Sequence, residues 1–218
     1  MISGAFAMGA YFVVFVMVHS LLADPGFKSL ARSALGKTFD RWQRLAYNLL
    51  ALLMILPFFF IMIFLPDRTL YVIPAPWSWL MAGGQLLAAL ALLQTTRQTG
   101  VSYFLGLSQL RKESVAARGR PASGEGRLVK DGFYCHIRNP LFFFATVFIW
   151  LFPFMTENLL AFNILTTIYF YIGARHEERS LREEFGEEYE EYKKRVPMFL
   201  PRLRCQGKCA RENMKISK

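Results

Sequence analysis

Five runs of apolar residues, separated by blocks that hold most of the charge, constrain this chain more than any other feature. The runs cover roughly residues 4–23, 45–65, 77–95, 141–156 and 158–174. The first three are long enough to cross about 30 Å of hydrocarbon at about 1.5 Å per residue. The last two are shorter, and we expect a helical hairpin whose second arm continues past the bilayer. The sequence therefore predicts an all-α integral membrane protein with five transmembrane helices and a cytosolic amphipathic tail.

The basic residues predict how these helices are oriented. The segments 24–44, 96–140 and 174–218 hold 5, 8 and 12 Lys and Arg residues, and the opposite side holds only Arg68. Such an excess is typical of the cytosolic side of a membrane protein. We therefore expect a multi-pass protein of a bacterial or archaeal inner membrane, with its N-terminus outside and its C-terminus in the cytosol.

The net charge of +10 and the three cysteines exclude other classes of protein. Because the basic residues lie in blocks between apolar runs, they indicate a lipid bilayer as the partner and no nucleic acid. An odd number of cysteines (Cys135, Cys205 and Cys209), all in expected cytosolic segments, predicts reduced thiols. No cluster of metal ligands is evident, so no metal site is predicted.

The segment GRLVKDGFYCHIRNPLFFF, which begins at Gly126, predicts a helix start next to a cation. Asn139 is a good N-cap and Pro140 suits the first helical position. With Arg138 just before it, this helix N-terminus is a natural site for a carboxylate or phosphate. Alternatively, Arg138 only follows the positive-inside rule. Tyr134 offers an aromatic face for adenine or a sulfonium, unless it is an interfacial belt residue.

The segment after the last apolar run combines a charged helix with an apolar-aromatic stripe. The stripe recurs at helical spacing and consists of Leu181, Phe185, Tyr189, Tyr192 and Val196. By itself it predicts an amphipathic helix in the membrane interface. Glu177 and Glu178, however, follow the last run by about one turn, where an acidic pair is costly unless it meets a cation. Pro197 and Pro201 then end the helix and turn the chain, as a lid requires.

Together the two segments resemble a family of membrane methyltransferases that includes isoprenylcysteine carboxyl methyltransferases, phospholipid methyltransferases and methanethiol methyltransferases. The segments around His19, RLAYN and FLGLSQL resemble its methanethiol methyltransferase and NnrU-like branch. The residues that match the two family motifs are Leu128, Val129, Gly132, Tyr134, Arg138, Pro140, Glu177, Glu178, Leu181, Phe185, Gly186, Tyr189, Tyr192, Val196, Pro197 and Pro201.

The resemblance implies that S-adenosylmethionine binds between the segment 134–142 and the helix of Glu177, under the tail. It also implies a core at 96–204, which follows a three-helix region at 1–95 and precedes a flexible basic tail at 205–218. The cofactor contacts that it assigns are Gln109, Leu128, Val129, Tyr134, Asn139, Pro140, Phe142, Glu177 and Glu178. For a thiol acceptor, Arg138 or Arg175 would act catalytically by lowering the pKa of that thiol.

Two departures from the family pattern bear on the reaction. The usual His is Asn139 here and the following Tyr is Phe142, so we expect no general base at position 139. The Arg with which prenylcysteine enzymes bind their substrate corresponds to Gly173, which puts a carboxylate substrate in doubt.

The sequence thus predicts an S-adenosylmethionine-dependent membrane methyltransferase that acts on a lipophilic or small thiol acceptor at the cytosolic face. Two alternatives stay open. One is a prenylcysteine carboxyl methyltransferase. The other is a non-enzymatic, NnrU-like membrane protein that keeps the cofactor scaffold.

Overall fold

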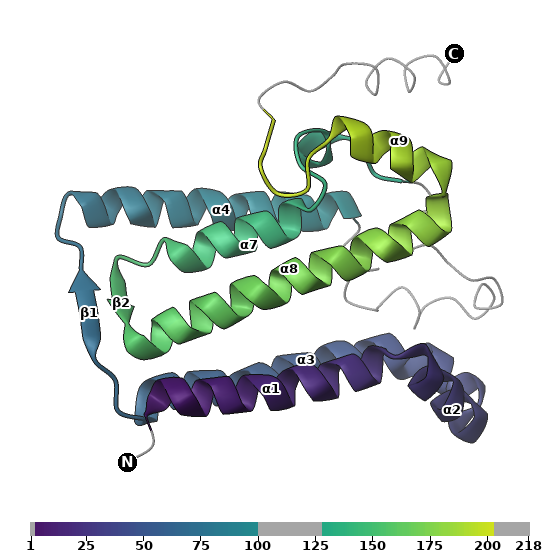
Figure 1. The fold of residues 1–218 in the computed structure, drawn as a ribbon, viewed down its shortest axis with the longest axis horizontal. Coiled ribbons are helices and arrows are strands. Elements are labelled where there is room, and N and C mark those ends of the chain that lie inside the picture. The colour runs from purple at the N-terminus through teal and green to yellow at the C-terminus, as the bar shows by residue number, and fades with distance from the viewer. Residues whose placement is uncertain (1–2, 100–127, 203–218) are drawn as a thin grey trace. The chain divides into compact units, whose positions relative to one another are not determined.

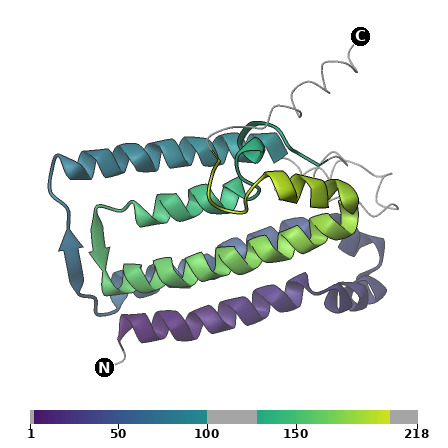
Figure 2. The same cartoon turned by 45° about the horizontal axis from the view of Figure 1, so that its top comes forward.

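The structure, a computed structural model, describes residues 3–99 and 128–202 (Figures 1 and 2). These residues form two compact units, 3–82 with 152–168, and 83–99 with 128–151 and 169–202. In chain order the elements are α1 (Gly4–Ala23), α2 (Pro25–Leu35), α3 (Lys37–Phe64), β1 (Thr69–Val72), α4 (Trp77–Thr99), the 3-10 helix η1 (Gly132–Cys135), α7 (Pro140–Trp150), β2 (Phe154–Thr156), α8 (Glu157–Phe185) and α9 (Glu187–Arg195).

Three of the described helices are long and apolar enough to cross a membrane. They contain the segments Gly4–Leu22, Leu45–Phe64 and Trp77–Thr99, which coincide with the first three apolar runs. Large apolar side chains on them are exposed, among them Leu52, Ile63 and Leu87. Such exposure is expected of surfaces that lipid covers, because apolar patches of this size are rare on soluble proteins. The described part of the chain is predominantly helical, and its three long apolar helices are those of a membrane protein, as predicted.

The fourth apolar run differs from the prediction. We expected it to stay helical to residue 156, but α7 ends at Trp150. Pro153, which cannot donate a backbone hydrogen bond, lies just beyond, and β2 pairs antiparallel with β1. The prediction of an all-α fold thus missed a small two-stranded sheet. The apolar residues 151–156 belong mainly to this turn and strand, so composition alone overstated the length of the helix.

In the first unit, α1 and α3 pack side by side in opposite directions (Figure 1). The ring of Phe58 makes edge-on contacts with Tyr11 at 4.8 Å and Phe15 at 5.8 Å between centroids. One turn further along α1, the imidazole of His19 bonds to the hydroxyl of Tyr47. His19, near the C-terminal end of α1, therefore joins two helices.

In the second unit, α7 lies beside α4 (Figure 2). The side chain of Gln85 donates to the carbonyl of Phe148 at 3.2 Å. On the α8 side, the ring of Phe142 lies 5.6 Å from that of Phe170. A Cβ atom at Gly173 would lie 3.4 Å from the ring of Phe142. The start of α7 is therefore closely packed against α8 through aromatic side chains.

The charged tail consists of two helices joined at Gly186. We expected one helix from residue 175 to Val196, but α8 ends at Phe185, and Gly186 has φ +51°, which side chains rarely adopt. The stripe residues on both helices nevertheless meet in one cluster, which consists of Tyr189, Tyr192 and Val196 packed with Leu128, Leu181 and Phe185. Because protein covers this stripe, the tail does not present it to a membrane interface.

Cys135 corrects the predicted thiol state, because it is disulfide-bonded in the structure. An odd number of cysteines excludes complete pairing but not a single bridge, and spacing alone does not reveal which cysteines approach one another.

Candidate functional site

A positive-φ glycine starts the candidate site, which lies wholly within the second unit. Gly132 has φ +62°, and the side chain of Gln98 occupies the space that a Cβ atom at this position would need. Only glycine combines this backbone conformation with so close an approach at low cost. The turn of η1 that follows brings Tyr134 toward α8 and α9.

Backbone hydrogen bonds fasten the residues before α7 to the end of the described chain. The amide of Arg138 donates to the carbonyl of Pro197 at 2.9 Å, and that of Asn139 to Met198 at 3.4 Å. In the reverse direction, the amide of Arg202 donates to the carbonyl of His136 at 3.0 Å. The segment 197–202, called here the strap, is therefore hydrogen-bonded to the residues before α7 and holds the start of that helix in place.

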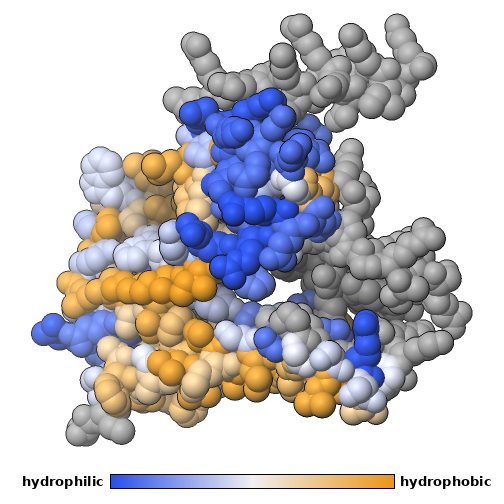
Figure 3. Space-filling view, turned by 45° about the vertical axis from the view of Figure 1, so that its right-hand side comes forward, coloured by the Kyte–Doolittle hydropathy of each residue, from blue (hydrophilic) through white to orange (hydrophobic). Residues whose placement is uncertain are grey.

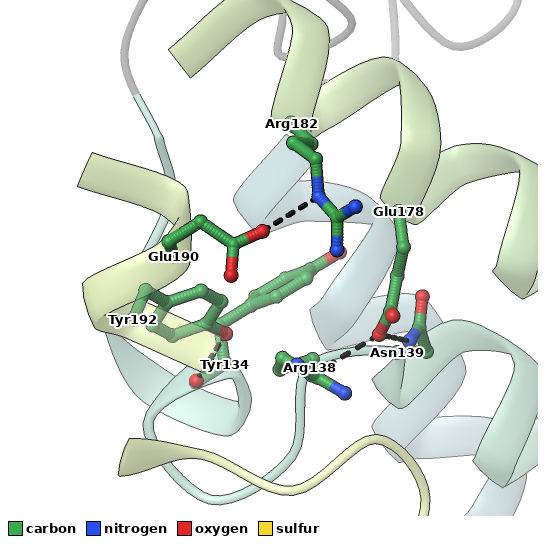
Figure 4. Close-up of polar contacts among 7 residues, drawn as sticks. All are labelled: Tyr134, Arg138, Asn139, Glu178, Arg182, Glu190 and Tyr192. Atoms are coloured by element: carbon green, nitrogen blue, oxygen red, sulfur yellow. Dashed lines mark hydrogen bonds and ion pairs between the residues drawn. The ribbon is translucent and has the colours of Figure 1, made fainter. Parts of the chain in front are cut away.

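Glu178 is held by two residues from the start of α7 (Figure 4). Its Oε1 lies 3.0 Å from Nε of Arg138 and accepts a hydrogen bond from Nδ2 of Asn139 at 3.1 Å. The side chains of Arg138 and Glu178 are 9% and 12% exposed. A pair this deeply buried costs several kcal/mol to desolvate, so both charges depend on one another.

Asn139 occupies the predicted N-cap position of α7, and Pro140 starts the helix as expected. Its side chain, however, makes no capping hydrogen bond. The amide nitrogen instead donates to Glu178. A hydrogen bond to a charged carboxylate is stronger than one between neutral groups, such as a capping bond. The prediction that the Asn139 side chain caps the helix is therefore wrong, and its contact is with the acidic pair.

Glu177, the other member of the pair, has a different environment. Within the described residues it forms no hydrogen bond or ion pair. Burial raises the pKa of its carboxyl, and the charge of Glu178 raises that pKa further. The side chain is nevertheless exposed by its accessible surface. Both observations hold for a side chain that water can reach but that protein surrounds on most sides.

Tyr134 lies close enough to feel the charge of Glu177. Burial raises the pKa of its phenol, and the charge of Glu177 adds to that effect. Tyr134 therefore stays protonated at neutral pH and can act as a hydrogen-bond donor.

Several buried polar atoms of the second unit have no hydrogen-bond partner within the described residues. They are Nε and Nη1 of Arg138, the hydroxyl of Tyr189 and Oε1 of Gln98. Nε of Arg138 approaches Glu178, but its N–H bond does not point at the carboxylate, so the contact is an ion pair without an aligned hydrogen bond. Unsatisfied buried groups are costly and mark places where a ligand can supply the missing partners.

Helix α9 covers η1 and the end of α8. Arg182 pairs with Glu190 at 2.6 Å across the turn at Gly186, and Lys130 pairs with Glu188 at 2.6 Å. Hydrophilic side chains gather on the outer face of this part of the unit (Figure 3, blue). On the inner face, the hydroxyl of Tyr192 donates to the backbone carbonyl of Tyr134 at 2.6 Å (Figure 4).

We expect Tyr192→Phe to destabilise the second unit by about 0.5–1.5 kcal/mol, because it removes the bond to the carbonyl of Tyr134 and keeps the buried ring. Thermal unfolding in detergent or nanodiscs measures the change. Tyr171→Phe is the matched control, since Tyr171 is half-exposed and its ring stacks on Phe199 in either variant. Equal unfolding temperatures for the two variants would contradict the expected role of the Tyr192 hydroxyl.

The structure places the predicted site residues unequally. Arg138, Asn139 and Glu178 are in contact, and Glu177 and Tyr134 interact electrostatically. Pro140 is fully buried, Phe142 packs between α7 and α8, and Leu128 joins the aromatic cluster, while Val129 is half-buried next to it. Arg175 is exposed on α8. Gln109 lies outside the described residues.

Two further polar residues of the site were not among the predicted ones. Tyr189 is 1% exposed, and burial together with the charge of Glu178 raises the pKa of its phenol. Its helical spacing indicated only an apolar stripe. Gln98 comes from the end of α4, about thirty residues before the predicted motif, and nothing in its local sequence indicated a role.

No group of three or more His, Cys, Asp and Glu side chains able to hold a metal occurs in the part of the chain that the structure describes.

Comparison with known proteins links the chain to a set of curated relatives that share one name. Methanethiol S-methyltransferase 2 of Bradyrhizobium diazoefficiens is 33% identical over 197 residues, which cover 87% of this chain and 70% of the relative. Methanethiol S-methyltransferase 1 of the same organism is 28% identical over 86% of this chain and 64% of its own length. A methanethiol S-methyltransferase of Pseudomonas deceptionensis is 40% identical over 39% of this chain and 33% of the relative. No protein-family model and no solved structure matches the chain.

Proposed function

The chain belongs to the methanethiol S-methyltransferase family, and from that premise we propose that it transfers the methyl group of S-adenosylmethionine to a small thiol. The observation that carries the proposal is the acidic pair of Glu177 and Glu178 next to Arg138, with buried polar groups that lack partners. A donor that bears both cationic groups and a carboxylate fits such a site.

The cationic groups of the donor suit Glu177. Among the described residues, this carboxyl forms no ion pair with a cation. Burial and the charge of Glu178 both oppose its ionisation. A sulfonium or ammonium group supplies the missing positive charge. The phenol ring of Tyr134 lies nearby and adds an aromatic face, which attracts cations.

The carboxylate of the donor suits Arg138. Its Nη1 is buried without a hydrogen-bond partner in the described residues, and the first backbone N–H groups of α7 follow directly. The hydroxyl of Tyr189 is a further buried donor. The donor, when bound, would supply an electrophilic methyl group, and the protein would contribute alignment.

The packing around Phe142 supports a small acceptor. A Cβ atom at residue 173 would already be in van der Waals contact with the ring of Phe142, at 3.4 Å. The interface of α7 and α8 is apolar here, with Phe142 and Phe170 in contact. Such a surface suits an uncharged thiol better than the carboxylate of a prenylcysteine. The thiol-activating roles expected of Arg138 and Arg175 stay predictions.

The test is product analysis with the purified chain in nanodiscs and labelled S-adenosylmethionine. The acceptor panel contains methanethiol, longer alkanethiols, a prenylcysteine and a phospholipid. We expect label in the thioether of the small thiols. Label in a methyl ester or in a lipid would overturn the choice of acceptor. Donor binding without transfer to any acceptor would indicate a non-enzymatic protein that keeps the scaffold.

We also propose that five helices cross the membrane and place the site on the cytosolic side. The support is the distribution of charge, since 25 of the 26 Lys and Arg residues lie on one side of that arrangement. A reporter fused after Lys218 is expected in the cytosol, and a tag before Met1 outside. Two reporters on the same side would contradict an odd number of crossings.

A further inference from the structure

The two adjacent carboxyls of the site differ in the number of hydrogen-bond and ion-pair partners that they have. Oε1 of Glu178 receives both Arg138 and Asn139 (Figure 4). Glu177, one residue earlier on α8, has no hydrogen bond or ion pair within the described residues. Two carboxyls in one site with such different surroundings are suited to different tasks.

We propose that Glu177 is the general base that takes the proton of the acceptor thiol, while Glu178 positions Arg138 and Asn139. The inference rests on the proposed thiol methylation and adds a catalytic residue to it. A thiol needs such a base because the thiolate is the nucleophile.

The surroundings of Glu177 favour proton uptake at its carboxylate oxygens. In the donor-free protein its pKa is raised by burial and by the charge of Glu178. Once methyl transfer removes the positive charge of the donor, the same surroundings again favour the protonated carboxyl. The side chain is also accessible, so an acceptor can reach it. The titratable groups that interact with Glu177 are Tyr134 of η1, Glu178 of α8 and Tyr189 of α9. Arg138 and Arg182 act on Tyr189 beside them.

The other groups of the site are less suited to this task. Burial raises the pKa of Tyr134 and of Tyr189, so both phenols keep their protons near neutral pH. Asn139 cannot accept a proton in this range. His136 bonds through Nδ1 to the carbonyl oxygen of Arg202 at 2.7 Å, within the strap. Among these groups, Glu177 alone joins a raised carboxyl pKa to an unoccupied carboxylate.

The proton balance of the reaction fits this assignment. The carboxylate of Glu177 accepts the S–H proton, and the electron pair of that bond stays on the acceptor sulfur. That sulfur forms the new S–CH3 bond, and the pair of the broken C–S bond remains with the donor. A cation beside Glu177 keeps it ionised before transfer, and loss of that positive charge makes the carboxylate a stronger base as the reaction proceeds. The proton then leaves to water.

The experiment compares wild type with Glu177→Gln in single turnovers, using methanethiol, which is mostly protonated at neutral pH, and thiophenol, which is largely ionised. Donor affinity is measured separately, so that each variant is fully loaded. His176→Gln is the matched control, because His176 is an exposed neighbour on α8. We expect Glu177→Gln to lower the methanethiol rate about 100- to 10,000-fold and the thiophenol rate less than about 10-fold. The remaining methanethiol rate should rise with pH, because it depends on thiolate from solution.

An infrared difference spectrum gives a readout that needs no turnover. We expect S-adenosylmethionine, added without acceptor, to remove a protonated-carboxyl band from the wild-type spectrum near the raised pKa. The band should be missing in Glu177→Gln and present in His176→Gln. Equal losses for both thiols, or no such band, would overturn the base assignment while thiol methylation stands. A wild-type protein that methylates neither thiol would overturn the proposed function and, with it, the base.

Discussion

Replacing Arg138 by methionine is expected to destabilise the folded protein by about 3–5 kcal/mol. Among the described residues, the substitution leaves Glu178 as a buried charge with the amide of Asn139 as its one remaining partner. A buried ion pair broken from one side costs this much. The side chains concerned are 9% and 12% exposed, so water screens the loss little. Equilibrium unfolding in mixed micelles measures the difference in free energy.

The chain offers a matched control for this prediction. Arg68 and Glu157 lie 2.7 Å apart, but their side chains are 74% and 42% exposed. Arg68→Met should therefore cost at most about 1 kcal/mol. The double variant Arg138→Met with Glu178→Gln should recover part of the loss, because no unpaired charge remains. Equal costs for Arg138→Met and Arg68→Met would contradict the importance of burial for the first pair.

Glu177→Gln is expected to weaken the binding of S-adenosylmethionine about 10- to 150-fold, because one charge-assisted contact is worth about 1.5–3 kcal/mol. In wild type the affinity should rise with pH up to the raised pKa of Glu177 and then level off, since a bound cation favours the ionised carboxyl. Binding should release protons in this range. Calorimetry in buffers of different ionisation enthalpy measures both effects.

The same substitution should have the opposite effect on the donor-free protein. Because folding raises the pKa of Glu177, the folded state favours the neutral form. Its contribution to stability is present below the ordinary pKa of a carboxyl and falls as the pH rises through the raised one. Glu177→Gln should therefore stabilise the donor-free protein slightly at neutral pH. Glu183→Gln, at an exposed position of the same helix, is the control and should change neither affinity nor its pH dependence.

The sequence predicted those parts of the fold that depend on long local patterns. The first three apolar runs became α1, the greater part of α3, and α4, because a bilayer requires about 20 apolar residues for each crossing. The helix start at Pro140 followed from a Pro that is favoured in the first turn. The motif residues Arg138, Asn139 and Glu178 did come together, although α7 and most of α8 separate them.

The parts that were not predicted depend on distant partners. Whether the Asn139 side chain caps α7 or bonds to Glu178 depends on an acceptor 39 residues away. The strand at Phe154 needs β1, more than 80 residues earlier, and an apolar run does not reveal this pairing. Tyr189 looked like one more residue of a stripe because spacing reports which face a residue occupies, and not whether its hydroxyl finds a partner.

The strap has a consequence for how the protein is made. The amides of Arg138 and Asn139 find their acceptors at Pro197 and Met198, about sixty residues later in the chain. While a ribosome is still adding those residues, the start of α7 has already been synthesised but lacks these bonds. We therefore expect a nascent chain released before Pro197 to insert its helices and yet to bind no methyl donor. Assembly of the site therefore has to follow synthesis of the strap, although the motif at the start of α7 is made much earlier.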